Sequence, residues 1–188
     1  YFRRMETSHG GEAPWRGTDG PLHITRGPRD NPLHDAFVSA TNQAGYTTTS
    51  DYNGGRQEGF GPADMTVYKG RRWSSANAYL KPAMKRGNVT LMTGALVERL
   101  LFDGTRCIGV RFCHKGKQQD ILAGKDIILS AGAIGSPAIL QRSGIGPAKL
   151  LRSHGIDVIA DRAGVGANLQ DHLEVYFQIA CTQPITLY

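Results

Sequence analysis

Residues 126–146 read DIILSAGAIGSPAILQRSGIG. The apolar run that ends at Ala131-Gly132 predicts a short buried strand, of the kind found at the centre of an α/β sheet. Ser136-Pro137 predicts the start of a helix through Gln141. A glycine-led turn at 129–137 brings bare backbone close to a bound group, because glycine has no Cβ. The local sequence alone favours a simpler reading, in which Gly132 and Gly135 only permit a tight turn.

The stretch before this segment has the texture of an antiparallel sheet. Asp103-Gly104 and Lys115-Gly116 lie between alternating segments, which is a strong hairpin signal. The predicted strands are Val89–Met92, Leu96–Phe102, Cys107–Cys113 and Gln119–Leu122. After the segment we expect a helix over Pro147–His154, a strand over Asp157–Ala160 and a loop at 164–166.

The first half of the chain is less regular. Residues 1–31 predict a long loop with one extended piece at 20–24. Asn31 and Pro32 are typical of a helix start, and an apolar stripe from Leu33 to Ala44 follows them. A short strand is expected at 65–68. A helix that begins at Ser74 or Ser75 should be ended or bent by Pro82.

Charge and cysteine content exclude several classes of protein. The chain has 188 residues, with 22 Lys and Arg against 16 Asp and Glu, a net charge of +6. The basic residues are scattered without interleaved aromatic residues, which argues against nucleic-acid binding and leaves a weak attraction to an anionic membrane surface open. The three cysteines form no CxxC, so no disulfide framework or zinc site is indicated, and Cys107 and Cys113 are expected to be small buried hydrophobes. The six histidines lack metal-ligand spacing, so no metal is predicted.

Both ends of the chain resemble cuts. The sequence opens at Tyr1-Phe2 with no initiator Met or apolar signal core, and it stops in mid-pattern at 185–188. We therefore expect an internal piece of a longer protein. No apolar run approaches the roughly 18 residues that cross a membrane.

Residues 132–146 resemble the second signature of the glucose-methanol-choline (GMC) oxidoreductases. The blocks GVGANLQDH (164–172) and GRRWSSANAYL (70–80) agree with the same family. Further blocks are similar to its choline-oxidising members: DYN at 51–53, QEGFG at 57–61 and CTQPITL at 181–187. Ala163 departs from the proline that the family usually has, which affects the stiffness of a loop.

The resemblance implies an α/β fold that is an incomplete GMC fold. It would combine an FAD-binding sheet portion, including the antiparallel β-meander, with part of an α+β substrate domain. Residues 1–87 would belong to the substrate-binding domain and 88–146 to the FAD-binding domain. Residues 147–188 would return toward the substrate domain.

The resemblance also implies an FAD-dependent oxidoreductase acting on CH–OH donors. Choline would be oxidised to betaine aldehyde, as in glycine betaine biosynthesis, with electrons passed to an unidentified acceptor other than oxygen. A dehydrogenase for another primary alcohol, or a non-catalytic truncated fragment, remains an alternative. No GxGxxG occurs in the chain, so FAD is implied rather than seen. The protein would lie in the cytoplasm or peripherally on the inner face of a bacterial or mitochondrial inner membrane.

Site residues follow from the same resemblance. The backbone of Val97 would hold the adenine of FAD, and Ala131 and Gly132 would be neighbours of the flavin. The family's catalytic His and its partner lie beyond Tyr188, so no catalytic residue is expected in this fragment and the stretch alone should be inactive.

The end of the 164–172 block and the residues directly after it are expected on the substrate side. His172 would hydrogen-bond the substrate or tune the flavin, although a lone histidine is more often structural. Asp171 could orient it or cap a helix. Glu174, followed by Tyr176 and Phe177, could hold a quaternary ammonium ion, or Glu174 could simply be a surface residue.

Overall fold

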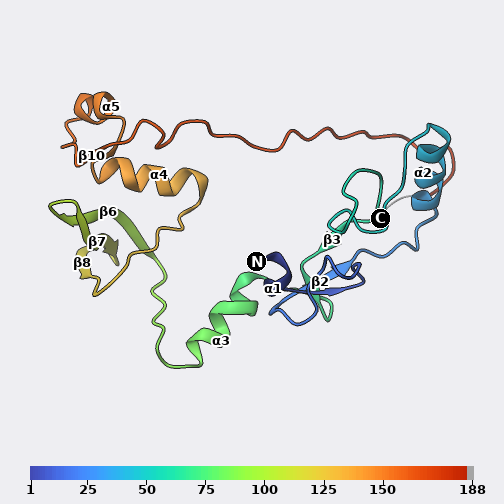
Figure 1. The fold of residues 1–188 in the computed structure, drawn as a ribbon, viewed down its shortest axis with the longest axis horizontal. Coiled ribbons are helices and arrows are strands. Elements are labelled where there is room, and N and C mark those ends of the chain that lie inside the picture. The colour runs from blue at the N-terminus through green and yellow to red at the C-terminus, as the bar shows by residue number, and fades with distance from the viewer. Residues whose placement is uncertain (186–188) are drawn as a thin grey trace. The chain divides into compact units, whose positions relative to one another are not determined.

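The structure, a computed structural model, describes residues 1–185. The chain divides into two compact units: Tyr1–Leu91 with Phe177–Tyr188, and Met92–Tyr176. Each is mixed in secondary structure, and Figure 1 gives the order of the elements. This mixture fits the predicted α/β class.

A small three-stranded sheet organises the first unit. The short helix α1 (Phe2–Met5) leads into β1 (Glu6–His9), which pairs in parallel with β2 (Leu22–Arg26). The short β3 (Asp64–Met65) pairs antiparallel with β2 on its other side. The extended piece expected at 20–24 is therefore present two residues later, whereas β1 lies where only a loop was predicted.

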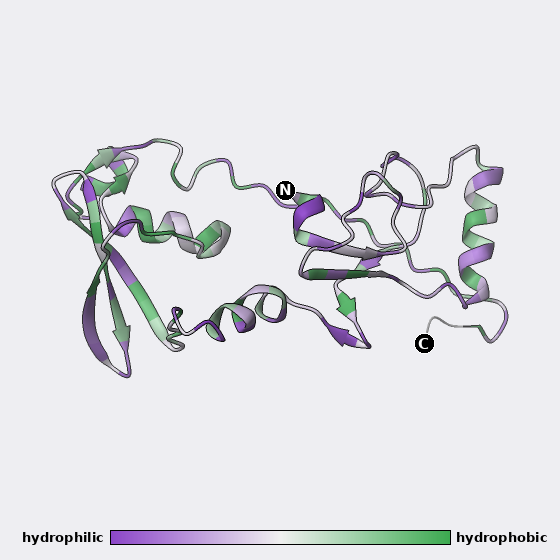
Figure 2. Ribbon diagram, turned by 60° about the horizontal axis from the view of Figure 1, so that its bottom comes forward, coloured by the Kyte–Doolittle hydropathy of each residue, from purple (hydrophilic) through white to green (hydrophobic). Residues whose placement is uncertain are grey.

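The helix α2 (Pro32–Gln43) begins as the sequence predicts. The side chain of Asn31 accepts a hydrogen bond from the backbone N–H of Leu33 at 2.9 Å, and Pro32 occupies the first turn. Figure 2 shows both apolar and polar bands around this helix. Phe37 on its apolar side is 56% exposed and makes an edge contact with Phe60.

A hairpin and a bent helix complete the first unit. The strands β4 (Val67–Tyr68) and β5 (Arg71–Arg72) pair across the turn at 69–70. The π-helix η1 (Ala76–Leu80) runs directly into α3 (Lys81–Met84). Pro82 therefore does not end the helix. It lies in the first turn of α3, directly after the π segment, and proline is tolerated in a first turn because it needs no N–H donor there.

The second unit contains the predicted meander. The antiparallel strands are β6 (Ala95–Asp103), β7 (Arg106–His114) and β8 (Lys117–Leu122). Their turns lie at Gly104-Thr105 and Lys115-Gly116, close to the predicted positions. Cys107 and Cys113 are half-buried on β7, so they are less enclosed than expected.

Helices pack on one face of this meander and form its core with it. The elements are α4 (Gly132–Arg142), β9 (Ile145–Gly146), α5 (Ala148–Ser153) and β10 (Ala160–Asp161), with β9 and β10 paired in parallel. The buried apolar side chains are Leu100, Phe112, Ile139, Ala148 and Leu151. Ser143 joins helix to sheet, because its Oγ accepts from Leu100 N at 2.8 Å and donates to Ile139 O at 2.6 Å.

Four predicted strands differ from the structure. The strand expected at 65–68 is divided between β3 and β4, which belong to different sheets. Residues 126–131 form no strand, and Ile128 is 88% exposed, because within residues 1–185 no neighbouring strand pairs with them. Residues 89–92 are likewise irregular. The strand expected at 157–160 is reduced to β10 at Ala160–Asp161, since only Ala160 and Asp161 reach β9.

Candidate functional site

The N-terminus of α4 offers open backbone. Gly132 adopts a φ of 83°, a left-handed conformation that strains any other residue, and a Cβ there would meet no atom within 4 Å. Ala131 donates its N–H to Ser136 Oγ at 2.9 Å, which pins the turn. The first N–H groups of a helix have no partner within the helix. Small residues at 131–133 therefore leave these donors accessible to an anionic or polar group.

A loop at 163–170 lies against the same helix. Gln141 on α4 donates from Nε2 to the carbonyl oxygen of Val165 at 2.9 Å. Gly166 has a φ of 81°, and a Cβ added to it would lie 2.7 Å from Gln141 Nε2. The left-handed φ is what favours glycine here, because the end of the flexible Gln141 side chain can shift away from an added Cβ. The blocks at 132–146 and 164–170 therefore lie side by side.

A cleft of about 440 Å³ lies between this helix and loop. Small and apolar side chains make up most of its wall, including Ala133, Ile134 and Pro137 on the helix side. Asn168 contributes an amide from the loop side, in a left-handed conformation with φ 55°. An apolar cleft with few polar groups beside free backbone donors suits a planar heterocycle.

Val97 lies at the opposite end of α4 from Gly132. It is half-buried on β6 and pairs with Phe112, and its carbonyl oxygen accepts from Arg142 Nη2 at 3.3 Å. Since α4 has 11 residues, its two ends are separated by about 16 Å. The roles expected for Val97 and Gly132 in holding FAD stay predictions.

His172 and Glu174 lie in an exposed, irregular segment that follows the cleft loop. Asp171 accepts from the backbone N–H of His172 at 2.8 Å, so in this structure it neither orients the imidazole nor caps a helix. The Glu174 carboxylate accepts a hydrogen bond from the hydroxyl of Tyr176, and this raises the pKa of Tyr176. Among residues 1–185, no hydrogen bond or ion pair joins His172 or Glu174 to α4.

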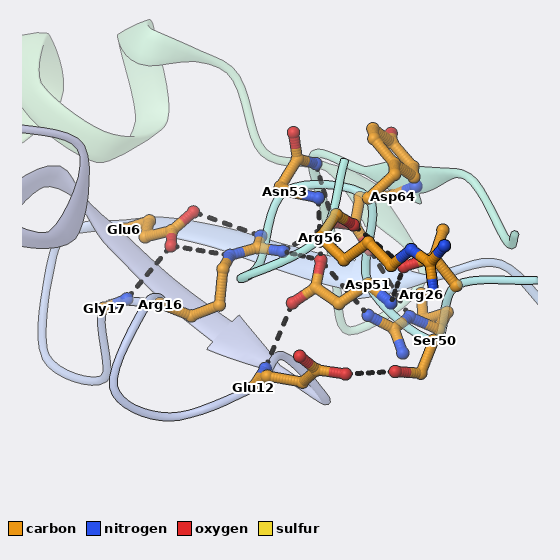
Figure 3. A network of polar contacts seen from close by, with 12 residues as sticks. Glu6, Glu12, Arg16, Gly17, Arg26, Ser50, Asp51, Asn53, Arg56 and Asp64 are labelled. Atoms are coloured by element: carbon orange, nitrogen blue, oxygen red, sulfur yellow. Dashed lines mark hydrogen bonds and ion pairs between the residues drawn. The ribbon is translucent and has the colours of Figure 1, made fainter. Parts of the chain in front are cut away.

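The first unit contains a buried charged cluster that the sequence did not reveal (Figure 3). Arg16 is 6% exposed and contacts three carboxylates. Its Nε and Nη2 donate to Glu6 at 2.9 and 3.2 Å, and its Nη1 donates to Asp51 at 2.7 Å and to Asp64 at 2.8 Å. These hydrogen bonds raise the pKa of Arg16 above its usual range, although burial opposes the shift.

The carboxylates of this Arg16 cluster have further partners. Asp51 is 1% exposed and accepts from the backbone N–H groups of Glu12 at 3.0 Å and of Asn53 at 3.1 Å. Burial alone would raise the pKa of Asp64, but the hydrogen bond from Arg16 and the smaller effects of its other neighbours lower it overall. The cluster therefore fixes the DYN block at 51–53 to β1 and β3.

Neither a metal centre nor a membrane span is evident in residues 1–185. No group of three or more His, Cys, Asp or Glu side chains there could hold a metal ion. No helix among those residues combines the length and the apolar character that crossing a bilayer requires. Of the choline-type block at 181–187, residues 186 and 187 lie outside the described residues.

Comparison with known proteins gives consistent matches. A family model described as GMC oxidoreductase matches residues 1–174. The chain is 57% identical to an oxygen-dependent choline dehydrogenase of Brucella anthropi and 55% identical to one of Rhizobium etli, and it aligns over all of its length in both. It covers 34% of each of those proteins, so it spans about a third of their length.

Solved structures give the same picture. An FAD-dependent oxidoreductase from Chaetomium thermophilum matches with a TM-score of 0.80 and 29% identity, over 87% of this chain and 31% of that one. A pyridoxine 4-oxidase from Mesorbium loti matches with a TM-score of 0.78 and 33% identity, over 85% and 32%.

Proposed function

The chain belongs to the GMC oxidoreductase family, and from that premise we propose that its polypeptide is an FAD-dependent oxidoreductase that oxidises choline to betaine aldehyde. One observation carries the proposal. The 132–146 signature and the 164–170 loop together form an apolar cleft beside free helix N–H groups. The relatives named choline dehydrogenase support the choice of alcohol.

The residues of this chain would bind and orient rather than perform the proton transfer. The backbone at Ala131 and Gly132 would contact the flavin ring system, and the backbone of Val97 would hold the adenine. Residues 88–146 would thus contribute to the FAD-binding domain, and 1–87 and 147–188 to the substrate side. Bound FAD would supply the acceptor for the hydride that leaves the alcohol carbon. The alcohol proton would pass to a base that the family carries beyond position 188.

Glu174 would hold the trimethylammonium group of choline. A carboxylate with aromatic faces nearby is the arrangement that binds a quaternary ammonium ion. Tyr176 and Phe177 follow Glu174 two and three positions later in the sequence. His172, two residues before Glu174, would hydrogen-bond the substrate oxygen or tune the flavin. The side chains of Glu174, Tyr176 and Phe177 are exposed in this structure, which leaves them accessible to a ligand.

A purified full-length polypeptide tests the proposal directly. We expect flavin absorbance, and choline-dependent reduction of a dye or of oxygen. Oxygen is the first acceptor to test, since the relatives are named oxygen-dependent. A preparation without flavin that fails to reduce either acceptor with choline would refute the proposal. If other primary alcohols are turned over faster than choline, the proposed cofactor stands and the proposed substrate is wrong.

The role of Glu174 needs a matched substrate pair. Glu174→Gln should raise the KM for choline roughly tenfold, because it removes the charge that faces the ammonium. It should leave unchanged the KM for the neutral isostere, in which carbon replaces nitrogen. Asp103→Asn, at an exposed position of β6 outside every block named above, serves as the control. An equal effect of Glu174→Gln on both substrates would contradict the assignment.

A further inference from the structure

A hollow of about 550 Å³ lies between the β4–β5 hairpin and the η1–α3 helix of the first unit. Four basic side chains line it: Lys69, Arg71, Arg72 and Lys81. Tyr68 and Trp73 supply its aromatic wall. None of these residues belongs to α4 or to the loop at 163–170.

The four cations of this basic hollow lack acidic partners. Among residues 1–185, none of them forms an ion pair with a carboxylate within 4.0 Å. Lys81 instead donates to Asn77 Oδ1 at 2.6 Å, and Lys69 Nζ lies 5.2 Å from the centre of the Tyr68 ring. Four uncompensated positive charges around one hollow favour a counter-ion of high charge.

The aromatic wall is held in place independently of any ligand. The indole N–H of Trp73 donates to the carbonyl oxygen of Pro21 at 2.8 Å. The Tyr68 ring stacks on His23 with centroids 3.7 Å apart, and His23 shares a 2.9 Å hydrogen bond with His9. Burial lowers the pKa of His23, and the charges of His9 and Lys69 lower it further. The charge of Lys69 therefore acts on the imidazole that stacks against the Tyr68 ring.

We propose that this basic hollow binds a small anion that carries one or more phosphoryl groups. A polyvalent phosphoryl group matches four positive charges better than a single carboxylate does. Guanidinium groups bind phosphate oxygens in pairs, and an ammonium adds a point charge. The charges surround a hollow rather than a flat face, which favours a soluble ligand over a lipid surface.

Inorganic pyrophosphate is the probe, titrated into the full-length polypeptide saturated with FAD. Trp73 in the wall of the hollow is the reporter, and Trp15, the other tryptophan of residues 1–188, is its matched control. The Trp15→Phe background keeps the reporter, and the Trp73→Phe background removes it. We expect a saturable fluorescence change in the first background and none in the second. Vesicles of phosphatidylcholine, with and without phosphatidylglycerol, test for a lipid source of the same group.

Two variants on one helical segment localise the binding. Lys81→Gln should weaken pyrophosphate binding about tenfold, the effect of one lost charge-assisted contact. Lys85→Gln, four residues later, is exposed and outside the hollow, so it should change nothing. A thermal midpoint for each variant checks that both fold. Arg72→Gln, on the hairpin side of the hollow, should also weaken pyrophosphate binding.

Three results would overturn the proposal: no saturable change, equal weakening by Lys81→Gln and Lys85→Gln, or binding to anionic vesicles without binding to pyrophosphate. Flavin absorbance and dye reduction are measured on the same preparation and do not depend on this hollow. Failure here would therefore be distinguishable from failure of the proposed oxidoreductase function.

Discussion

Replacing Arg16 with Met would leave three carboxylates facing one another in the interior of the first unit. Arg16 makes four hydrogen bonds of 2.7–3.2 Å to Glu6, Asp51 and Asp64. Removing one partner of a buried ionic cluster costs about 3–5 kcal/mol, because the remaining charges stay desolvated. Arg26 cannot replace it, since its ion-pair distances are 3.5 and 3.6 Å and its Nε is buried without a hydrogen bond.

The dependence on pH separates this effect from a packing defect. In the native protein the pKa of Asp64 is lowered overall, so its contribution is present above the unfolded pKa of about 4 and is lost as pH falls through the folded value. Without Arg16, protonation of Asp64 relieves repulsion instead. The stability deficit of Arg16→Met should therefore be largest near pH 7 and shrink toward pH 4.

Urea unfolding at a series of pH values, followed by tryptophan fluorescence, measures this deficit. Arg111→Met is the control, because its bidentate pair with Asp120 is exposed and its loss should leave the urea midpoint unchanged. The reasoning is refuted if Arg16→Met costs less than about 1 kcal/mol, or if its deficit is the same at every pH.

Three further changes test other contacts. Gly166→Ala should destabilise the loop by about 1–3 kcal/mol, since φ is 81° and the new Cβ would lie 2.7 Å from Gln141 Nε2; the flavin-to-protein absorbance ratio should fall, and an unchanged ratio would remove this contact from the cofactor site. Ser143→Ala should cost about 1–3 kcal/mol in thermal unfolding because it leaves the buried N–H of Leu100 without its 2.8 Å acceptor, whereas Ser153→Ala, at an exposed hydroxyl, should be neutral. Lys69→Gln should raise the pKa of His23 in a proton NMR titration, because the Lys69 charge is one of the causes that lower it; Lys85→Gln should not, and a shared response would rule out a local effect.

The parts of the fold that sequence predicted well are those decided by neighbouring residues. The meander follows from turn residues at 103–104 and 115–116, and the start of α2 follows from Asn31 and Pro32. The segment at 126–131 was wrong for the opposite reason. An apolar composition predicts a buried strand, but burial depends on a paired strand, which none of the described residues supplies.

The candidate site likewise contains one part that the sequence pointed to and another part that it did not. The resemblance to the GMC family pointed to the α4 start and to the 164–170 loop, and the Gln141–Val165 hydrogen bond joins them. The Arg16 cluster could not be predicted, because its members are 10 to 48 positions apart from Arg16 and share no period.

The segment that follows the cleft loop has a practical consequence for anyone who produces these residues by themselves. Leu173, Val175, Phe177 and Ile179 alternate with polar side chains, and each of the four is between 68% and 96% exposed. An exposed segment in which every second side chain is apolar can pair with the same segment of other molecules and aggregate as β-structure. Concentrated solutions of the isolated residues should become turbid and bind amyloid dyes. Val175→Lys or Phe177→Lys should prevent this aggregation.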